Sequence, residues 1–251
     1  MADRMKNNKI SIFYKLQIFL AFAAVAAVLL PVFLNDSHWP VFARDYLEAN
    51  GEEQTGAANI VSSIYLGYRA YDTLGETIVL LVAVSGTIGI ISFTGKNLAT
   101  GYNEDDFEGG NRKNRKRTVL MEVVTGKLGP VILIFGLYVM LFGHMSPGGG
   151  FQGGVVIASG IIFISLGTGG SENNILSHSG VLAKIEAVSF LLLVLASAIG
   201  LITGIGFFAN PFNGNPIPPV GYIILLNAMI GLKVGAGIAY MSVAMLGDTD
   251  L

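Results

Sequence analysis

The sequence predicts an all-α integral membrane protein with about six transmembrane helices, each an apolar run of roughly 20 residues. Only 13% of the 251 residues are charged and 52% are hydrophobic. Soluble domains carry about 25% charged residues, so this composition excludes an ordinary soluble fold. The 33 glycines are typical of membrane helices that pack closely.

The first predicted span covers residues 16–34 and follows a basic N-terminal stretch. We interpret it as a retained span rather than a signal peptide. The run is longer than a usual signal h-region, and Pro31-Val-Phe-Leu-Asn-Asp36 lacks a small-x-small cleavage site. A polar, mainly acidic segment follows at 35–71, and residues 57–68 are expected to form a partly buried helix leading into the next span.

The second predicted span, at 72–93, opens with Asp72-Thr-Leu-Gly-Glu76. Asp72 and Glu76 are four residues apart, which places both carboxylates on one helix face. Next comes a charged linker at 95–118 that contains Arg112-Lys-Asn-Arg-Lys-Arg117. Beside a membrane span, such a basic cluster indicates topology rather than a nucleic-acid or regulatory lipid site.

The third and fourth predicted spans, 120–142 and 151–166, flank the stretch Gly143-His-Met-Ser-Pro-Gly-Gly-Gly-Phe-Gln-Gly-Gly154. Proline blocks helix continuation and glycine permits a sharp turn or a close helix contact, so we expect a tight hairpin at a membrane surface. The hairpin residues are Pro147, Gly148, Gly149, Gly150, Gly153 and Gly154.

The fifth and sixth predicted spans, 181–208 and 220–246, flank a proline-rich loop at 209–219. Nearly all lysines and arginines outside the apolar cores lie on the side of the membrane that holds the N-terminus, the 94–127 linker, the 167–180 loop and the C-terminus, and the opposite side carries only Arg44 and Arg69. The positive-inside rule then predicts that both termini and the linker are cytoplasmic. The acidic segment, the hairpin and the proline-rich loop are expected on the opposite side.

Lys233 is the sharpest candidate, because it lies near the middle of an apolar span. A cation there costs roughly 2.5–3.5 kcal/mol on insertion scales. It is expected either to serve an ion path or to form a structural ion pair between helices or subunits. Its partner would be a carboxylate of this chain or of a neighbouring subunit.

Four further residues are ion-path candidates: Asp72, Glu76, His144 and Glu186. Asp72 and Glu76 offer hard oxygen ligands for a cation, or a proton site in which each tunes the other; alternatively, Glu76 simply reaches water. His144 is a proton carrier or an interfacial hydrogen-bonding residue. Glu186 is on an ion path, or it pairs with Lys184 or snorkels to the cytoplasmic surface.

The residue inventory limits the chemistry of this chain. It contains no cysteine, which excludes disulfides, iron–sulfur ligation and thiolate zinc sites within it. We find no metal-ligand spacing, phosphate-binding loop, dinucleotide fingerprint or nucleophile elbow. The chain is therefore predicted to have no catalytic residues, metal or cofactor of its own, and no nucleic-acid partner.

Two motifs resemble known subunits. The stretch 143–154 resembles the signature of the B subunit of multisubunit Na+/H+ (Mrp-type) antiporters, a four-span family that matches 119–246. Asn59-Ile-Val61 and the 69–76 stretch resemble the C-terminal part of the antiporter A subunit, which is a separate E subunit in membrane-bound hydrogenases. The resemblance implies a two-span E-type segment at 1–94, a cytoplasmic linker at 95–118 and a four-span B-like domain at 119–251.

This resemblance implies a multi-pass subunit in the plasma membrane of a prokaryote. Its partners would be the bilayer, Na+ and H+, and the other subunits of an Mrp-type antiporter or a hydrogenase-like redox complex. It would contribute to Na+/H+ translocation; the alternative is a purely structural assembly subunit with no ion path. A standalone transporter is disfavoured, because the two halves show no inverted repeat.

Overall fold

The computed structural model describes residues 2–34, 41–101, 119–168, 178–202, 204–212 and 218–246. Within these residues every regular element is a helix, which confirms the predicted all-α fold. The chain divides into two compact units, residues 1–43 and 44–251, which are described separately.

The first unit is dominated by helix α1, Ala2–Leu34. It contains the first predicted span, but its apolar core, Lys15–Pro31, is shorter than the other candidate spans. Five helices of the described residues are long and apolar enough to cross a membrane, and α1 is not among them. A sixth span therefore stays a prediction.

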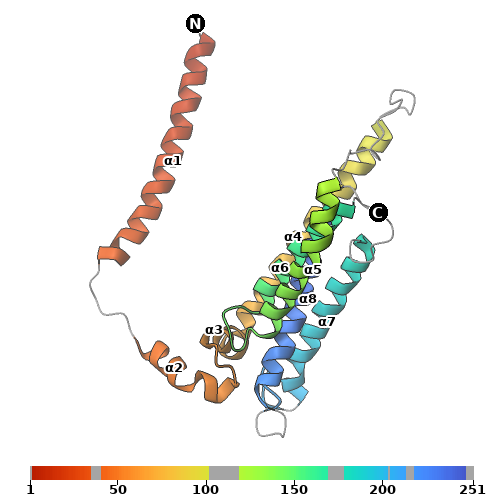
Figure 1. Ribbon diagram of the computed structural model, residues 1–251. Coiled ribbons are helices and arrows are strands. Elements are labelled where there is room, and N and C mark those ends of the chain that lie inside the picture. Colours follow the sequence, from red (N-terminus) through yellow and green to blue (C-terminus); the bar gives the residue numbers. More distant parts are fainter. Residues whose placement is uncertain are drawn as a thin grey trace. The chain divides into compact units, whose positions relative to one another are not determined.

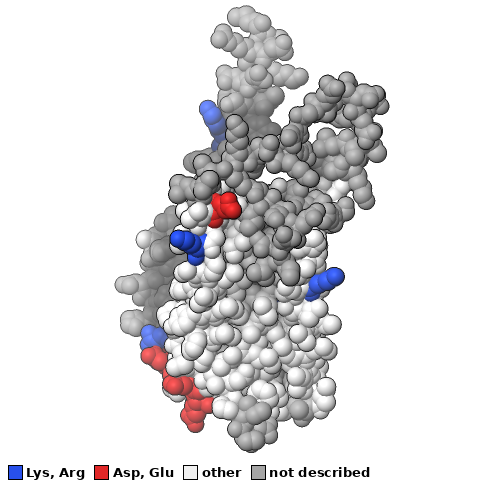
Figure 2. Space-filling view, turned by 45° about the vertical axis from the view of Figure 1, so that its right-hand side comes forward, with Lys and Arg blue, Asp and Glu red and all other residues white. Residues whose placement is uncertain are grey.

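The second unit contains those five helices, which correspond to predicted spans two to six and run alongside one another (Figure 1). Their outer surface carries few charged side chains in the view of Figure 2, as a lipid-facing or subunit-facing surface requires. The helices are α4 Ala70–Gly101, α5 Val119–Leu141, α6 Gly150–Thr168, α7 Ser179–Ile202 and α8 Val220–Met245.

Helix α7 ends earlier than the predicted boundary at residue 208. Gly204 adopts a positive φ of 74°, and the chain turns back so that the backbone N–H groups of Ile205 and Gly206 both donate to the carbonyl of Gly200 at 3.0 Å. These bonds satisfy a carbonyl at the helix end. The apolar run continues past the turn because Phe208 is buried in the core rather than in the helix.

Helix α8 is the central element, since it packs against α4, α5, α6 and α7. Small residues allow the close approach to α6: a Cβ added at Gly154 would lie 2.6 Å from the carbonyl oxygen of Gly231. Such glycine contacts bring helix backbones together in membranes. α8 is thereby buried on most sides, and so are the polar residues that it carries.

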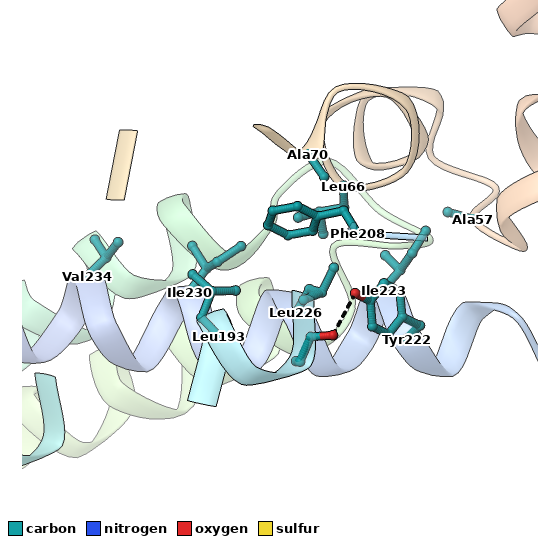
Figure 3. Packing of buried hydrophobic residues seen from close by; sticks show 11 residues of the cluster. Ala57, Leu66, Ala70, Leu193, Phe208, Tyr222, Ile223, Leu226, Ile230 and Val234 are labelled. Atoms are coloured by element: carbon teal, nitrogen blue, oxygen red, sulfur yellow. Dashed lines mark hydrogen bonds between the residues drawn. The ribbon is translucent and has the colours of Figure 1, made fainter. Parts of the chain in front are cut away.

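The core joins α8 to α7 and to the segment that precedes α4. Figure 3 shows Leu66, Phe208 and Leu226 converging there, while the Tyr222 hydroxyl donates to the carbonyl of Ala196 at 3.1 Å. The phenol is thus satisfied within an apolar environment, as a buried tyrosine requires.

Three short elements precede α4: α2 Phe42–Thr55, α3 Ile60–Ser62 and the π-helix η1 Ser63–Tyr68. The last two form the partly buried helix expected at 57–68. In η1 the backbone N–H of Arg69 donates to the carbonyl of Ile64, the five-residue spacing of a π-helix. This segment brings polar side chains against the hairpin between α5 and α6.

Candidate functional site

A buried ion pair lies between α7 and α8. The Lys233 ammonium is 3.4 Å from Glu186 Oε1, and the two residues are 0% and 4% exposed. The ammonium also donates a hydrogen bond of 2.8 Å to the backbone carbonyl of Thr77 on α4. Three helices therefore meet at this pair, whose members are far apart in the sequence.

The partner of Glu186 differs from the sequence expectation. Lys184 is exposed and Glu186 does not snorkel; its carboxylate turns into the bundle toward Lys233. Gly237, one turn beyond Lys233 on α8, makes this possible. A Cβ at Gly237 would lie 2.7 Å from Glu186 Oε1, so only glycine leaves room for the carboxylate in this position.

The charged groups of this pair are incompletely hydrogen-bonded. At 3.4 Å the ammonium and carboxylate do not meet hydrogen-bond geometry, and Glu186 Oε1 accepts no hydrogen bond from the described residues. Buried charges stabilise a fold only when their geometry is good and their remaining polar atoms are satisfied. By this criterion the pair contributes little stability as an ion pair between the two helices.

A second polar cluster holds the hairpin at 143–149. The Asn59 side chain donates to the carbonyls of Gly143 at 2.8 Å and Ser146 at 2.9 Å. Its backbone N–H donates to the backbone carbonyl of His144. The Ser62 hydroxyl donates to the same Gly143 carbonyl at 2.8 Å. The segment just before α4 thus holds the predicted hairpin through hydrogen bonds to its carbonyls, an arrangement called the clasp below. The sequence patterns did not indicate this role for Asn59 and Ser62.

Asn227 on α8 completes this cluster. Its Oδ1 accepts hydrogen bonds from the backbone N–H of Gly150 at 2.7 Å and from the Tyr65 hydroxyl at 3.0 Å. Burial raises the pKa of Tyr65 above its ordinary value, which keeps the phenol a donor at neutral pH. Asn227 caps the first turn of α6 from another helix; an amide inside an apolar span is the sequence signal that could have identified it.

Asp72 and Glu76 lie away from the buried pair. Both are exposed on α4, whereas Thr73 and Thr77 face the bundle. Asp72 forms an ion pair with Arg69. The two carboxylates therefore share a face, as the spacing predicted, and that face is directed away from the rest of this chain.

His144 lies in the hairpin and is half-buried. Its Nδ1 is 3.0 Å from the carbonyl of Leu141, which can only accept, so this nitrogen carries the hydrogen. The ring stacks on Phe142 with centroids 6.3 Å apart. No contact joins His144 to Lys233 or Glu186 among the recorded interactions of the described residues.

A cavity of about 560 Å³ opens between the end of α2, η1 and the start of α8. Its polar lining is largely self-satisfied: Tyr68 donates to Gln54 at 2.8 Å, and Asn210 donates to Pro219 at 2.8 Å. Across the described part of the chain, no three histidine or acidic side chains gather to hold a metal ion. The buried pair is therefore the candidate site with the most distinctive chemistry.

Sequence comparison links this architecture to antiporter subunits. Residues 120–240 match the family described as a domain related to the MnhB subunit of Na+/H+ antiporter. An uncharacterized protein of Methanocaldococcus jannaschii is 32% identical over 199 residues, covering 72% of this chain and 74% of that protein. A putative antiporter subunit mnhB2 of Staphylococcus aureus is 31% identical over 100 residues, which are 39% of this chain and 65% of that subunit.

Two solved structures share the fold. A chain of the membrane-bound sulfane sulfur reductase, an archaeal respiratory membrane complex, aligns with a TM-score of 0.63 and 24% identity over 94% of this chain and 97% of that one. A chain of the Mrp complex from Dietzia sp. DQ12-45-1b aligns with a TM-score of 0.64 and 23% identity, covering 94% of this chain but 26% of that one.

Proposed function

We propose that this chain is an Mrp-type antiporter B subunit, because residues 120–240 match the MnhB-related family, and that it contributes to Na+/H+ translocation within a multisubunit membrane complex. The observation that carries this proposal is the Lys233–Glu186 pair inside the helix bundle. Ionisable groups at membrane depth are costly and usually mark ion or proton pathways. Here the pair is incompletely hydrogen-bonded as well as buried, which favours function over support.

The proposed mechanism uses Lys233 as a tethered cation. The ammonium keeps its bond to the Thr77 carbonyl, while an arriving ion competes with it for the carboxylate of Glu186. Loss of that ion restores the pair. A translocation step of this kind requires that the two charge states of the site have similar energies.

The outward carboxylates Asp72 and Glu76 extend this proposal to the chain surface. Their negative charge would concentrate cations where α4 meets the lipid or another subunit. His144 is proposed as a proton carrier at the hairpin. Each of these roles requires groups outside this chain, because Asp72 and Glu76 face away from the buried pair.

The N-terminal part is proposed to be an E-type unit joined to the B-like domain. The clasp of Asn59 and Ser62 on the hairpin supports this, because it connects the two proposed units through direct hydrogen bonds. The complex would be a standalone antiporter or part of a redox-driven assembly. A redox arm would have to reside in other subunits, since this chain has no cysteine to hold iron–sulfur clusters.

The test is Na+-dependent proton transport in membrane vesicles that contain the full complex, comparing wild type with Glu186→Gln and Lys233→Met. We expect transport to fall by at least about tenfold in both variants, with assembly retained on native gels. Glu122→Gln is the matched control, because Glu122 is an exposed carboxylate on α5. It should transport like wild type.

The alternative, a structural assembly subunit, predicts a different pattern. If both variants assemble and transport normally, the pair is dispensable and the translocation role is lost. If transport falls only in proportion to lost complex, the pair is an inter-helix support.

A further inference from the structure

We propose that the ion exchanged at the buried pair is a proton, bound at Oε1 of Glu186, and that Gly237 is the positioning residue that creates this proton site. This inference rests on the proposed function and specifies which of the two transported ions uses the pair. It places Na+ elsewhere in the complex. Three features of the site lead to it.

The first feature is an unused acceptor. Glu186 Oε1 is buried and receives no hydrogen bond from the described residues, although a buried carboxylate oxygen normally has a donor. A proton on this oxygen removes the negative charge that burial penalises. In the step, a hydronium ion gives its proton to Oε1: an O–H bond of hydronium breaks, an O–H bond forms at the carboxyl group, a water molecule is released, and the net charge of the pair changes from zero to +1.

The second feature is a poor environment for Na+. A hard cation requires several oxygen ligands, and here the carbonyl of Thr77 is already occupied by Lys233. Among the residues that the structure describes, no three acidic or histidine side chains gather at the pair. The ammonium itself, 3.4 Å from Oε1, would repel a second cation at the carboxylate.

The third feature is the space that Gly237 leaves beside Oε1 because it has no side chain. Oε1 lies over Gly237, where an added Cβ would be 2.7 Å away, and a methyl of Val84 on α4 lies 3.4 Å from the same position. The oxygen therefore lies beside Gly237, and a hydrocarbon group of α4 is the next side chain near that glycine. That space suits a proton, which needs no coordination shell, better than a metal ion.

The other titratable groups around the pair are few. Lys233 is the charged residue that α8 directs at Glu186, and the residue that α4 directs at the pair is Thr77, through its carbonyl. Tyr240, one turn beyond Gly237, is partly buried against the cluster containing Leu182. Lys184 on α7 itself is exposed. Among the described residues, Lys233 is therefore the charged group that faces the Glu186 carboxylate.

Infrared difference spectroscopy on the purified complex tests the proposal, because a protonated carboxyl group gives a carbonyl band that a carboxylate lacks. We expect a band that disappears as pH rises, is missing in Glu186→Gln, persists in the exposed-site control Glu122→Gln, and is unchanged by Na+ at fixed pH. A band that Na+ removes at constant pH overturns the proposal. So does the absence of any pH-dependent band attributable to Glu186.

Gly237→Ala tests whether the space beside Gly237 positions the carboxylate of Glu186. A Cβ at Gly237 would lie 2.7 Å from Oε1, so the carboxylate must move and its interaction with Lys233 must change; the pH at which the band disappears should therefore differ from wild type by about one unit or more. Gly86→Ala is the matched control, since a Cβ at Gly86 on α4 meets nothing within 4 Å. An unchanged titration in Gly237→Ala contradicts the positioning role.

The two proposals fail separately. If Na+ displaces the proton while Glu186→Gln abolishes transport, the translocation role stands and the proton assignment is wrong. If the band behaves as expected while Glu186→Gln transports normally, Glu186 is a proton site that lies outside the translocation path.

Discussion

Lys233 and Glu186 show how an expensive pair of side chains is tolerated inside a bundle. The ammonium gains one good hydrogen bond, to the Thr77 carbonyl at 2.8 Å, while the carboxylate is left at 3.4 Å with an unsatisfied oxygen. The position of Lys233 in an apolar span identified it from the sequence. Its partner was not identifiable, because Glu186 and Lys184 looked equally able to reach solvent until the packing against Gly237 was known.

Asn227 provides a residue-scale prediction about stability. Asn227→Ala leaves the buried N–H of Gly150 without its acceptor, at a cost of about 1–3 kcal/mol, whereas the hydroxyl of Tyr65 keeps its contact with the Ser62 hydroxyl at 3.1 Å. We expect the purified complex to unfold at a lower temperature than wild type. Asn50→Ala is the control, because the Asn50 amide bonds only to the exposed carbonyl of Tyr46. Equal melting temperatures for the two variants would show that the Asn227 cap contributes nothing.

The helices were the easiest elements to predict, since apolar runs of spanning length identify them directly. Five of the six predicted spans correspond to helices that meet the length and hydropathy of a membrane span. The end of α7 was misjudged because Phe208 is apolar for tertiary reasons: it fills the core after the turn at Gly204. Helix neighbours were less predictable still, because they depend on contacts such as Gly154 on Gly231, which have no local sequence signature.

The clasp between Asn59 and the hairpin is likewise a tertiary feature. The glycine-rich stretch predicted a turn, and α5 and α6 do end and begin there. Which polar groups would bind its carbonyls was not predictable, because Asn59 and Gly143 are joined only by the fold. The cluster of Asn59, Ser62, Tyr65 and Asn227 was therefore missing from the sequence-derived candidates.

On the outer face of α4, Asp72 pairs with Arg69, whereas Glu76 has no ion pair among the residues that the structure describes. Glu76 is exposed although its neighbour Thr77 contacts the buried Lys233, so its carboxylate lies within the predicted span and on the outside of this chain. A carboxylate at membrane depth is costly unless another group covers it. Glu76 thus lies on the outer surface of the chain, whereas Lys233 lies in the interior of the helix bundle.

Glu76→Gln tests the outer carboxylate separately from the buried Lys233–Glu186 pair. The substitution keeps size and removes charge at a site with few intrachain contacts, so we expect thermal stability within about 0.5 kcal/mol of wild type and reduced Na+-dependent transport. Stability is read from the melting of the complex and transport from proton movement in vesicles. Normal transport by an intact complex would make Glu76 an interfacial carboxylate without a role in the ion path.

The central claim, that the buried pair takes part in translocation, is tested most directly by the double variant Glu186→Gln, Lys233→Met in vesicles that contain the full complex. Removing both charges avoids the penalty of a lone buried charge, and such replacements are often neutral or stabilising. The account predicts a complex that assembles as well as wild type and has lost Na+-dependent proton transport. Wild-type transport by the assembled double variant would contradict it.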